Sequence, residues 1–67
     1  MMIHNRVQEL RTQAGLTQEE FARMLRVTRQ TIISLEKNRY VPSLEMGFKV
    51  AKVFGKPIED VFCYSED

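Results

Sequence analysis

The stretch TQEEFARMLRVTRQTIISL, from Thr17 to Leu35, carries the strongest structural signals in this chain. Thr17 and Glu20 are spaced as a capping box, in which each side chain accepts a hydrogen bond from the backbone N–H of the other residue. Such a box satisfies two N–H groups that would otherwise lack a partner at the start of a helix. The segment therefore predicts a helix that begins after Thr17 and runs to about Leu25.

The residues that follow predict a sharp turn into another helix. Arg26 and Val27 form the tight turn, and Thr28 is a good N-cap for a helix that runs through Leu35 or Glu36. A connection of about three residues forces a sharp angle between the two helices. The pattern therefore predicts a helix-turn-helix.

Start and stop signals divide the rest of the chain into three more helices. We expect these from the Asn5 cap to Gly15, from the Ser43 cap to Phe54, and from Ile58 to about Phe62, followed by a frayed tail over 64–67. Apolar residues recur at helical spacing, in the groups Val7, Leu10, Ala14; Phe21, Ala22, Leu25; Ile32, Leu35; and Leu44, Phe48, Ala51, Phe54. No run alternates with period two long enough for a strand. The predicted class is all-α, a compact five-helix domain over residues 1–67.

The second helix of the helix-turn-helix has two chemically different faces. The apolar side chains expected to point inward are Val27, Ile32 and Leu35. The other side offers groups suited to base edges, because Gln can bond N6 and N7 of adenine and Arg can bond O6 and N7 of guanine. The candidate base-reading residues are Arg29, Gln30, Ile33 and Ser34. In the alternative interpretation, Ile33 belongs to the core and the other three are ordinary solvated residues.

The charge is unevenly distributed along the chain, although the net charge is only +1. Residues 1–40 carry seven Lys and Arg against four Asp and Glu (+3), and residues 41–67 carry three against five (−2). A local excess of cations is what binding to phosphates requires. The segment from position 23 to 39 contains one acid, Glu36, and five cations: Arg23, Arg26, Arg29, Lys37 and Arg39.

Composition argues against several functional classes. The single cysteine, Cys63, allows no intrachain disulfide and no multi-cysteine metal site. The single histidine, His4, is expected in a mobile N-terminus, and no residues pair as nucleophile and base. The apolar runs are too short to span a bilayer, and the start lacks a signal-peptide pattern. We therefore expect a cytoplasmic protein that is not an enzyme, with no cofactor, metal, small-molecule ligand or membrane partner.

Six segments match a known family pattern, in order and with matching lengths between them. They are Leu16–Ala22, Val27–Ile32, Leu35–Arg39, Pro42–Glu45, Ala51–Gly55 and Ile58–Phe62. In these segments the chain resembles the lambda-repressor/Cro-like family, also called XRE-type regulators. The resemblance covers roughly residues 5–62 and implies a five-helix fold whose helix-turn-helix binds double-stranded DNA.

The resemblance also implies roles for individual residues. Gln18 matches a residue that anchors to phosphate and supports the recognition helix, and Arg11 with Glu36 matches a structural salt bridge. The groove-facing positions of the family match Thr28, Arg29, Gln30 and Ser34, with Ile33 on the same face. The set expected on the DNA backbone is Thr17, Gln18, Arg26, Thr28, Lys37, Asn38, Arg39 and Tyr40.

The chain departs from the family pattern at three positions. Arg26 stands in the turn where the family usually has Gly, at a position expected to need positive φ, which costs about 1 kcal/mol for a side chain with a Cβ. Asn38 replaces the usual Gly after the third helix, a milder exchange because Asn adopts that conformation more readily. Pro57 stands where Ser or Thr often caps the fifth helix, and it supplies no side-chain cap.

A single such domain contacts too few base pairs to be selective, since each wrong pair costs only ~1–3 kcal/mol. We therefore expect a homodimer on a near-palindromic operator, with half-site centres about 34 Å apart. The apolar residues expected to remain for the dimer contact after the core is filled are Met46, Val53, Ile58, Val61, Phe62 and Tyr64.

The expected activity is transcription regulation, mainly as a repressor that acts by occupying its site. Two alternatives remain at this point. The chain could be the antitoxin or accessory DNA-binding subunit of a two-protein system, or a protein-interaction module that does not bind DNA.

Overall fold

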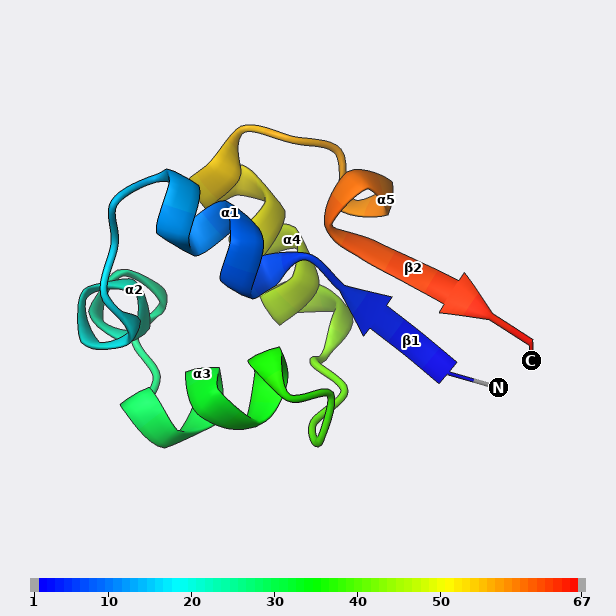
Figure 1. Cartoon of the computed structure of the whole chain (residues 1–67), viewed down its shortest axis with the longest axis horizontal. Coiled ribbons are helices and arrows are strands. Elements are labelled where there is room, and N and C mark those ends of the chain that lie inside the picture. Colours follow the sequence, from blue (N-terminus) through cyan, green and yellow to red (C-terminus); the bar gives the residue numbers. More distant parts are fainter. Residues whose placement is uncertain (1, 67) are drawn as a thin grey trace.

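The computed structural model describes residues 2–66 and contains five helices and two short strands (Figure 1). The helices pack around one core, and the two strands lie side by side at one end of the molecule, next to both chain termini. The elements in chain order are β1 (Met2–Asn5), α1 (Val7–Gln13), α2 (Gln18–Leu25), α3 (Arg29–Glu36), α4 (Leu44–Phe54), α5 (Ile58–Val61) and β2 (Phe62–Ser65). The five expected helices are therefore confirmed, with boundaries within one or two residues.

Side-chain caps begin the three central helices, as the sequence predicts. The Thr17 hydroxyl accepts from the Glu20 N–H at the start of α2, and the Glu20 carboxylate accepts from the Thr17 N–H, so the capping box is complete. Thr28 caps α3 and Ser43 caps α4 in the same way, each accepting from an N–H three residues on. These caps fix where each helix starts.

The prediction of an all-α fold is wrong in one respect, because the chain ends form a two-stranded sheet. β1 and β2 pair antiparallel, with His4 opposite Cys63 and Asn5 opposite Phe62. His4 therefore belongs to a strand rather than to a mobile end, and Tyr64 lies in β2 rather than in a frayed tail. Asp67 lies outside the described residues. The strands are four residues long and come from opposite ends of the sequence, so neither has a local signal.

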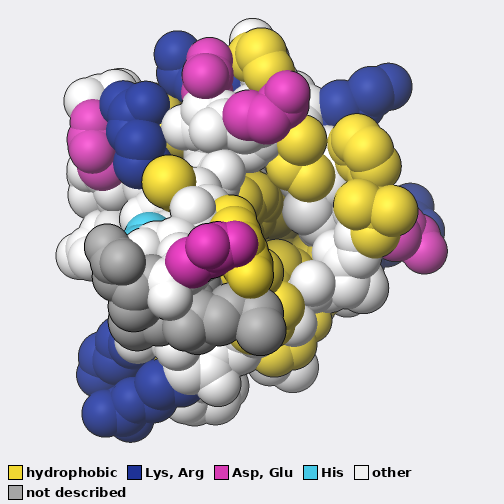
Figure 2. Space-filling view, turned by 90° about the vertical axis from the view of Figure 1, so that its right-hand side faces the viewer, with side chains coloured by type: hydrophobic (Ala, Val, Ile, Leu, Met, Phe, Trp, Pro, Cys, Tyr) yellow, Lys and Arg dark blue, Asp and Glu magenta, His cyan; other side chains and the backbone are white. Residues whose placement is uncertain are grey.

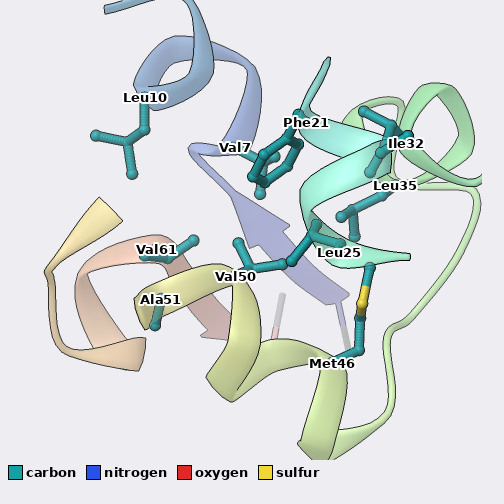
Figure 3. Packing of buried hydrophobic residues seen from close by; sticks show 11 residues of the cluster. Val7, Leu10, Phe21, Leu25, Ile32, Leu35, Met46, Val50, Ala51 and Val61 are labelled. Atoms are coloured by element: carbon teal, nitrogen blue, oxygen red, sulfur yellow. The ribbon is translucent and has the colours of Figure 1, made fainter. Parts of the chain in front are cut away.

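The core is a single cluster to which all five helices contribute (Figure 3). Phe21, Ile32 and Leu35 are fully buried in its centre, and the Phe21 ring stacks on Phe54 with 5.2 Å between ring centroids. Burial of this apolar surface is the main force that holds α2 against α3 and α4. The buried hydrophobic residues are Val7, Leu10, Phe21, Ala22, Leu25, Ile32, Leu35, Met46, Val50, Ala51 and Val61.

The face that α4 turns toward the core differs from the expected one. Leu44 and Phe48 are exposed, at 71% and 54% of their surface, although their spacing places them on one stripe with Ala51. The core receives Met46 and Val50 together with Ala51 of the expected stripe, and Phe54 packs against it. Gly47 is buried against Ile58 and Phe62. Both stripes of α4 are apolar, so periodicity alone could not choose between them.

Residues 2–66 contain no helix with the length and hydrophobicity to span a membrane; α4, the longest, has 11 residues.

Candidate nucleic-acid interface

The turn between α2 and α3 consists of three residues, Arg26, Val27 and Thr28. Arg26 ends α2 in the left-handed conformation, with φ 60° and ψ 42°, and its N–H donates to backbone carbonyls of the last turn of α2. The Val27 N–H donates to the Ala22 carbonyl at 3.0 Å, which closes the end of α2. The positive φ expected at Arg26 is thereby confirmed, and the three-residue connection gives the helix-turn-helix geometry.

The outer face of α3 presents polar groups that the fold does not use. Arg29 and Gln30 are exposed, and Ser34 is partly exposed. Within residues 2–66 these three side chains make no hydrogen bond or ion pair, so their polar atoms are available to a ligand. Ile33 on the same side is partly exposed and lies outside the core cluster, which disagrees with the alternative that places it in the core.

A shallow hollow of about 320 Å³ lies between this face and the loop after α3. Every residue that lines it carries a polar or cationic group, and it joins the middle of α3 to the loop residues Arg39 and Tyr40. The residues around it are Thr28, Gln30, Thr31, Ser34, Arg39 and Tyr40. Two groups of residues predicted separately, groove-facing and backbone-contacting, therefore border one concave surface.

The loop after α3 begins at a second left-handed residue, Asn38, with φ 58°. The Asn38 N–H donates to the Leu35 carbonyl, and the Arg39 N–H donates to the Ser34 carbonyl at 2.9 Å. These bonds turn the chain away from the helix axis. As a result Lys37 and Arg39 stand exposed beside the end of α3.

Asn5 holds this loop, although it lies 33 positions before Asn38 in the sequence. No local sequence pattern predicts this contact. Its Nδ2 donates to the Leu35 carbonyl and to the Asn38 Oδ1, both at 2.9 Å, while its Oδ1 accepts from the Val7 N–H. The sequence predicts Asn5 only as a cap of the first helix. The structure makes it a link between β1, the start of α1 and the end of α3.

The expected salt bridge between Arg11 and Glu36 is present and almost fully buried. Arg11 Nε lies 2.6 Å from Glu36 Oε2, and the two side chains are 9% and 3% exposed. Arg11 Nη1 also donates to the Leu16 carbonyl at 2.8 Å. The pair therefore ties α1 and the α1–α2 connection to the end of α3.

Gln18 and Thr17 lie at the N-terminus of α2, where their side chains already have partners in the fold. The Gln18 amide donates to Glu36 Oε1 at 3.1 Å, which fits its expected role of support for α3. The hydrogen bond from the Thr17 N–H lowers the pKa of Glu20 below its ordinary value. The Thr17 hydroxyl accepts the cap bond from the Glu20 N–H. A hydrogen bond from the Thr17 side chain to the Glu20 carboxylate also lowers the pKa of Glu20.

The electrostatics of this side of the molecule favour an anionic partner. Glu36, the one acid between positions 23 and 39, is buried against Arg11, so its charge is compensated and faces away from solvent. The N-terminus of α3 adds the positive end of its helix dipole. The exposed cations on α3, its preceding turn and its following loop are Arg26, Arg29, Lys37 and Arg39.

The residues expected at a dimer contact differ in burial: some lie in the core, some are partly buried and one is exposed. Met46 and Val61 belong to the core, at 7% and 1% exposure, so the expectation that they remain available after the core is filled is wrong. Val61 is buried because α5 packs against α4, and Met46 is buried because α4 is rotated relative to the expected stripe. The others form two groups: Val53, Ile58 and Phe62 are partly buried against the core, and Tyr64 is exposed.

Comparison with known proteins places this geometry in a family. The sequence profile described as helix-turn-helix matches residues 7–61, most of the chain. A solved Bacteroides fragilis protein assigned as DNA-binding has the same fold, with a TM-score of 0.82 over 91% of this chain and 98% of that one, at 24% identity.

Relatives with higher sequence identity than this solved structure are named as transcriptional regulators or as a repressor. A helix-turn-helix-type transcriptional regulator of Methanocaldococcus jannaschii is 51% identical over 94% of this chain and 96% of its own length. Another from Methanothermobacter thermautotrophicus is 52% identical over 91% and 90%. The cryptic phage CTXphi transcriptional repressor RstR of Vibrio cholerae is 35% identical over 97% of this chain and 59% of its own length. The chain therefore belongs to the lambda-repressor-like, or XRE-type, family of helix-turn-helix DNA-binding transcriptional regulators.

Proposed function

We propose that the chain is a sequence-specific repressor, a single domain that binds a near-palindromic operator as a homodimer in the cytoplasm. The observation that carries this proposal is the outer face of α3, whose polar side chains are unused by the fold and flanked by cations. The name of RstR, a transcriptional repressor, supports repression rather than activation.

Base reading is assigned to α3, which is the right size to enter a major groove. Gln30 lies opposite the buried residues Ile32 and Leu35, so it reaches deepest, with Arg29, Ile33 and Ser34 around it. Gln and Arg recognise adenine and guanine through paired hydrogen bonds, and Ile33 suits a thymine methyl group.

Backbone contact is assigned to the residues that surround this face. Lys37, Arg39 and Tyr40 extend from the loop after α3, and Arg26 extends from the turn before it. Thr17 and Gln18 lie at the N-terminus of α2, whose positive dipole end suits a phosphate, and Thr28 and Asn38 lie next to α3. These contacts set orientation and affinity but carry no sequence information.

The test compares two substitutions on two kinds of DNA, after the preferred site has been selected from a random pool. Gln30→Ala is expected to cost ~1–3 kcal/mol of binding free energy on the selected site and little on random DNA. Arg39→Ala is expected to weaken both, and to reduce the slope of log affinity against log salt by about one. Fluorescence anisotropy titrations at several salt concentrations measure both effects.

Two outcomes would contradict the proposal. Equal losses on selected and random DNA for Gln30→Ala would remove Gln30 from base reading. No binding of the unmodified chain to any DNA at low salt and micromolar protein would exclude the regulator function and favour a protein-interaction module.

A further inference from the structure

The loop that follows α3 takes its backbone hydrogen bonds from the end of that helix. The N–H groups of Lys37, Asn38 and Arg39 donate to carbonyls of residues 33–35. Helix ends fray readily, so these bonds alone do not hold the loop still. Figure 2 looks onto the end of the molecule that carries the sheet, and Lys and Arg side chains gather at its lower edge, the side on which α3 lies in Figure 1. The sheet and the cationic side of the molecule therefore meet at this end.

The Asn5 side chain connects the sheet to the loop in one defined orientation. Its Oδ1 accepts from the Val7 N–H at 3.0 Å, so Nδ2 is directed toward the end of α3. There Nδ2 donates to the Leu35 carbonyl and to the Asn38 Oδ1, each at 2.9 Å. A side-chain amide has two N–H donors and one carbonyl oxygen, and all three have a partner here. Rotation of the amide by half a turn would place its oxygen against two other oxygens, so the three bonds fix its position.

Asn5 is itself held by the sheet and the core. It pairs with Phe62 across the two strands, and the N–H of the next residue, Arg6, donates to the Val61 carbonyl at 2.9 Å. Val61 is almost fully buried in the core. At the other end of the link, Asn38 has a φ of 58° and sets the direction in which the chain leaves α3. One side chain thus connects the core and the sheet to the residue at which the loop turns.

We propose that Asn5 is a positioning residue for DNA binding, which holds the loop after α3 so that Lys37 and Arg39 meet the phosphate backbone. This inference rests on the proposed function, which assigns these two cations to phosphates. A loop that is already held in place loses less conformational freedom on binding than a mobile one, so the link raises affinity by preorganisation. Its effect is the same for all DNA sequences, because phosphate contacts carry no sequence information.

The first measurement follows amide hydrogen exchange in the free protein by NMR. Asn5→Ser keeps an oxygen for the Val7 N–H, because Ser forms the same kind of turn, but its side chain is too short to reach α3 and adds no charge. Exchange at the Arg39 amide is expected to become at least about fivefold faster, since the loop opens more often once the link is lost. The Val27 amide, which closes α2, should exchange as before. Asn38→Gly removes the acceptor from the other side and keeps the left-handed turn, and it replaces Asn5→Ser if that variant does not fold.

The second measurement is a double-mutant cycle with anisotropy titrations on selected and random DNA. Asn5→Ser is expected to weaken binding about fivefold on both, the effect of freeing one or two side chains that bind phosphate. In a Lys37→Ala/Arg39→Ala background the same substitution should weaken binding less than about twofold, because the cations that the link positions are gone. Leu10→Val is the matched control for stability, because it shortens a buried side chain of α1 and leaves the Asn5 bonds in place. It should not change the affinity, and circular dichroism checks that every variant is folded.

The outcomes separate this inference from the proposed function. Unchanged exchange at the Arg39 amide would overturn the inference, whatever the DNA titrations show. An equal loss of affinity in the background without the two cations, or in Leu10→Val, would overturn it as well, since either would indicate a general weakening of the fold. If the unmodified chain binds DNA through Gln30 and Arg39 as proposed but Asn5→Ser binds equally well, the inference alone fails. If the unmodified chain binds no DNA, the proposed function fails and the inference fails with it.

Discussion

Arg26 holds a backbone conformation that its side chain disfavours. At φ 60° the Cβ of any residue other than glycine crowds the following carbonyl, which costs roughly 1–2 kcal/mol. The conformation persists because the Arg26 N–H and the Val27 N–H both bond to carbonyls of α2. Retention of Arg at a strained turn position is consistent with the phosphate contact proposed for it.

Arg26→Gly should therefore stabilise the fold. We expect the free energy of unfolding to rise by about 0.5–1 kcal/mol, since relief of the strain exceeds the greater freedom that glycine has in the unfolded chain. Urea unfolding followed by circular dichroism measures this change. Arg26→Ala is the matched control, because it removes the guanidinium but keeps the Cβ, and it should give no gain. Equal stability of the Gly and Ala variants would show that the turn stores no strain.

Some residues of the candidate site can be placed from the sequence, and others cannot. The outward placement of Gln30 and Ser34 follows from the buried positions of Ile32 and Leu35 on the same helix, so a helical period predicts it. The link from Asn5 to Asn38 joins residues 33 positions apart, and no local pattern encodes it. Periodicity predicts the face of a helix, whereas contacts between distant segments require the packed fold.

The starts and ends of the helices follow well from short stretches of sequence. Caps at Thr17, Thr28 and Ser43, and left-handed ends at Arg26 and Asn38, are properties of a few neighbouring residues. The sheet was missed because each of its strands is stabilised by the other and not by its own sequence. Periodicity does not predict the orientation of α4, because that helix is apolar on two sides: one packs against the core, and the other, with Leu44 and Phe48, is exposed.

The Arg11–Glu36 pair is the ionic contact that holds three elements together. Glu36 accepts from Arg11 on α1 and from Gln18 at the start of α2, and it is the last residue of α3. Both partners of the pair are buried, so removal of one charge leaves the other without compensation in a poorly solvated site. Such a loss costs ~3–5 kcal/mol.

Glu36→Gln tests this contact against an exposed pair of the same kind. We expect a loss of ~3–5 kcal/mol in the free energy of unfolding. Part of it should be recovered in the double variant Arg11→Met/Glu36→Met, which removes both charges but also the partners of the Leu16 carbonyl and the Gln18 amide. Glu9→Gln is the matched control, because the Arg6–Glu9 pair is about half exposed and solvent already screens it. Chemical denaturation of the four proteins gives the comparison. Similar losses for Glu36→Gln and Glu9→Gln would show that burial does not strengthen the pair.

Two surfaces with different chemistry lie on different sides of one small core. The polar and cationic surface belongs to α3 and the loops beside it, and the apolar surface belongs to α4, α5 and the sheet. The core joins them rigidly, because Ile32 and Leu35 of α3 and Val50 of α4 are fully buried in the same cluster. In the proposed homodimer, each α3 would therefore be held rigidly relative to the rest of its subunit.

A rigid dimer of this kind should depend strongly on the spacing of the two half-sites. We expect the tightest binding when their centres are about 10 base pairs apart, one turn of DNA. Insertion of five base pairs, about half a turn, moves one half-site to the opposite side of the duplex, where the second α3 cannot reach it. Affinity should then fall at least about tenfold, toward that of a single half-site, since the gain from linked binding is lost when both sites cannot be engaged. Anisotropy titrations on a series of spacings measure this dependence. DNA with a single half-site provides the control, because it gives the affinity that the unfavourable spacings should approach. Equal tight binding of the unmodified chain to all spacings would contradict a rigid dimer.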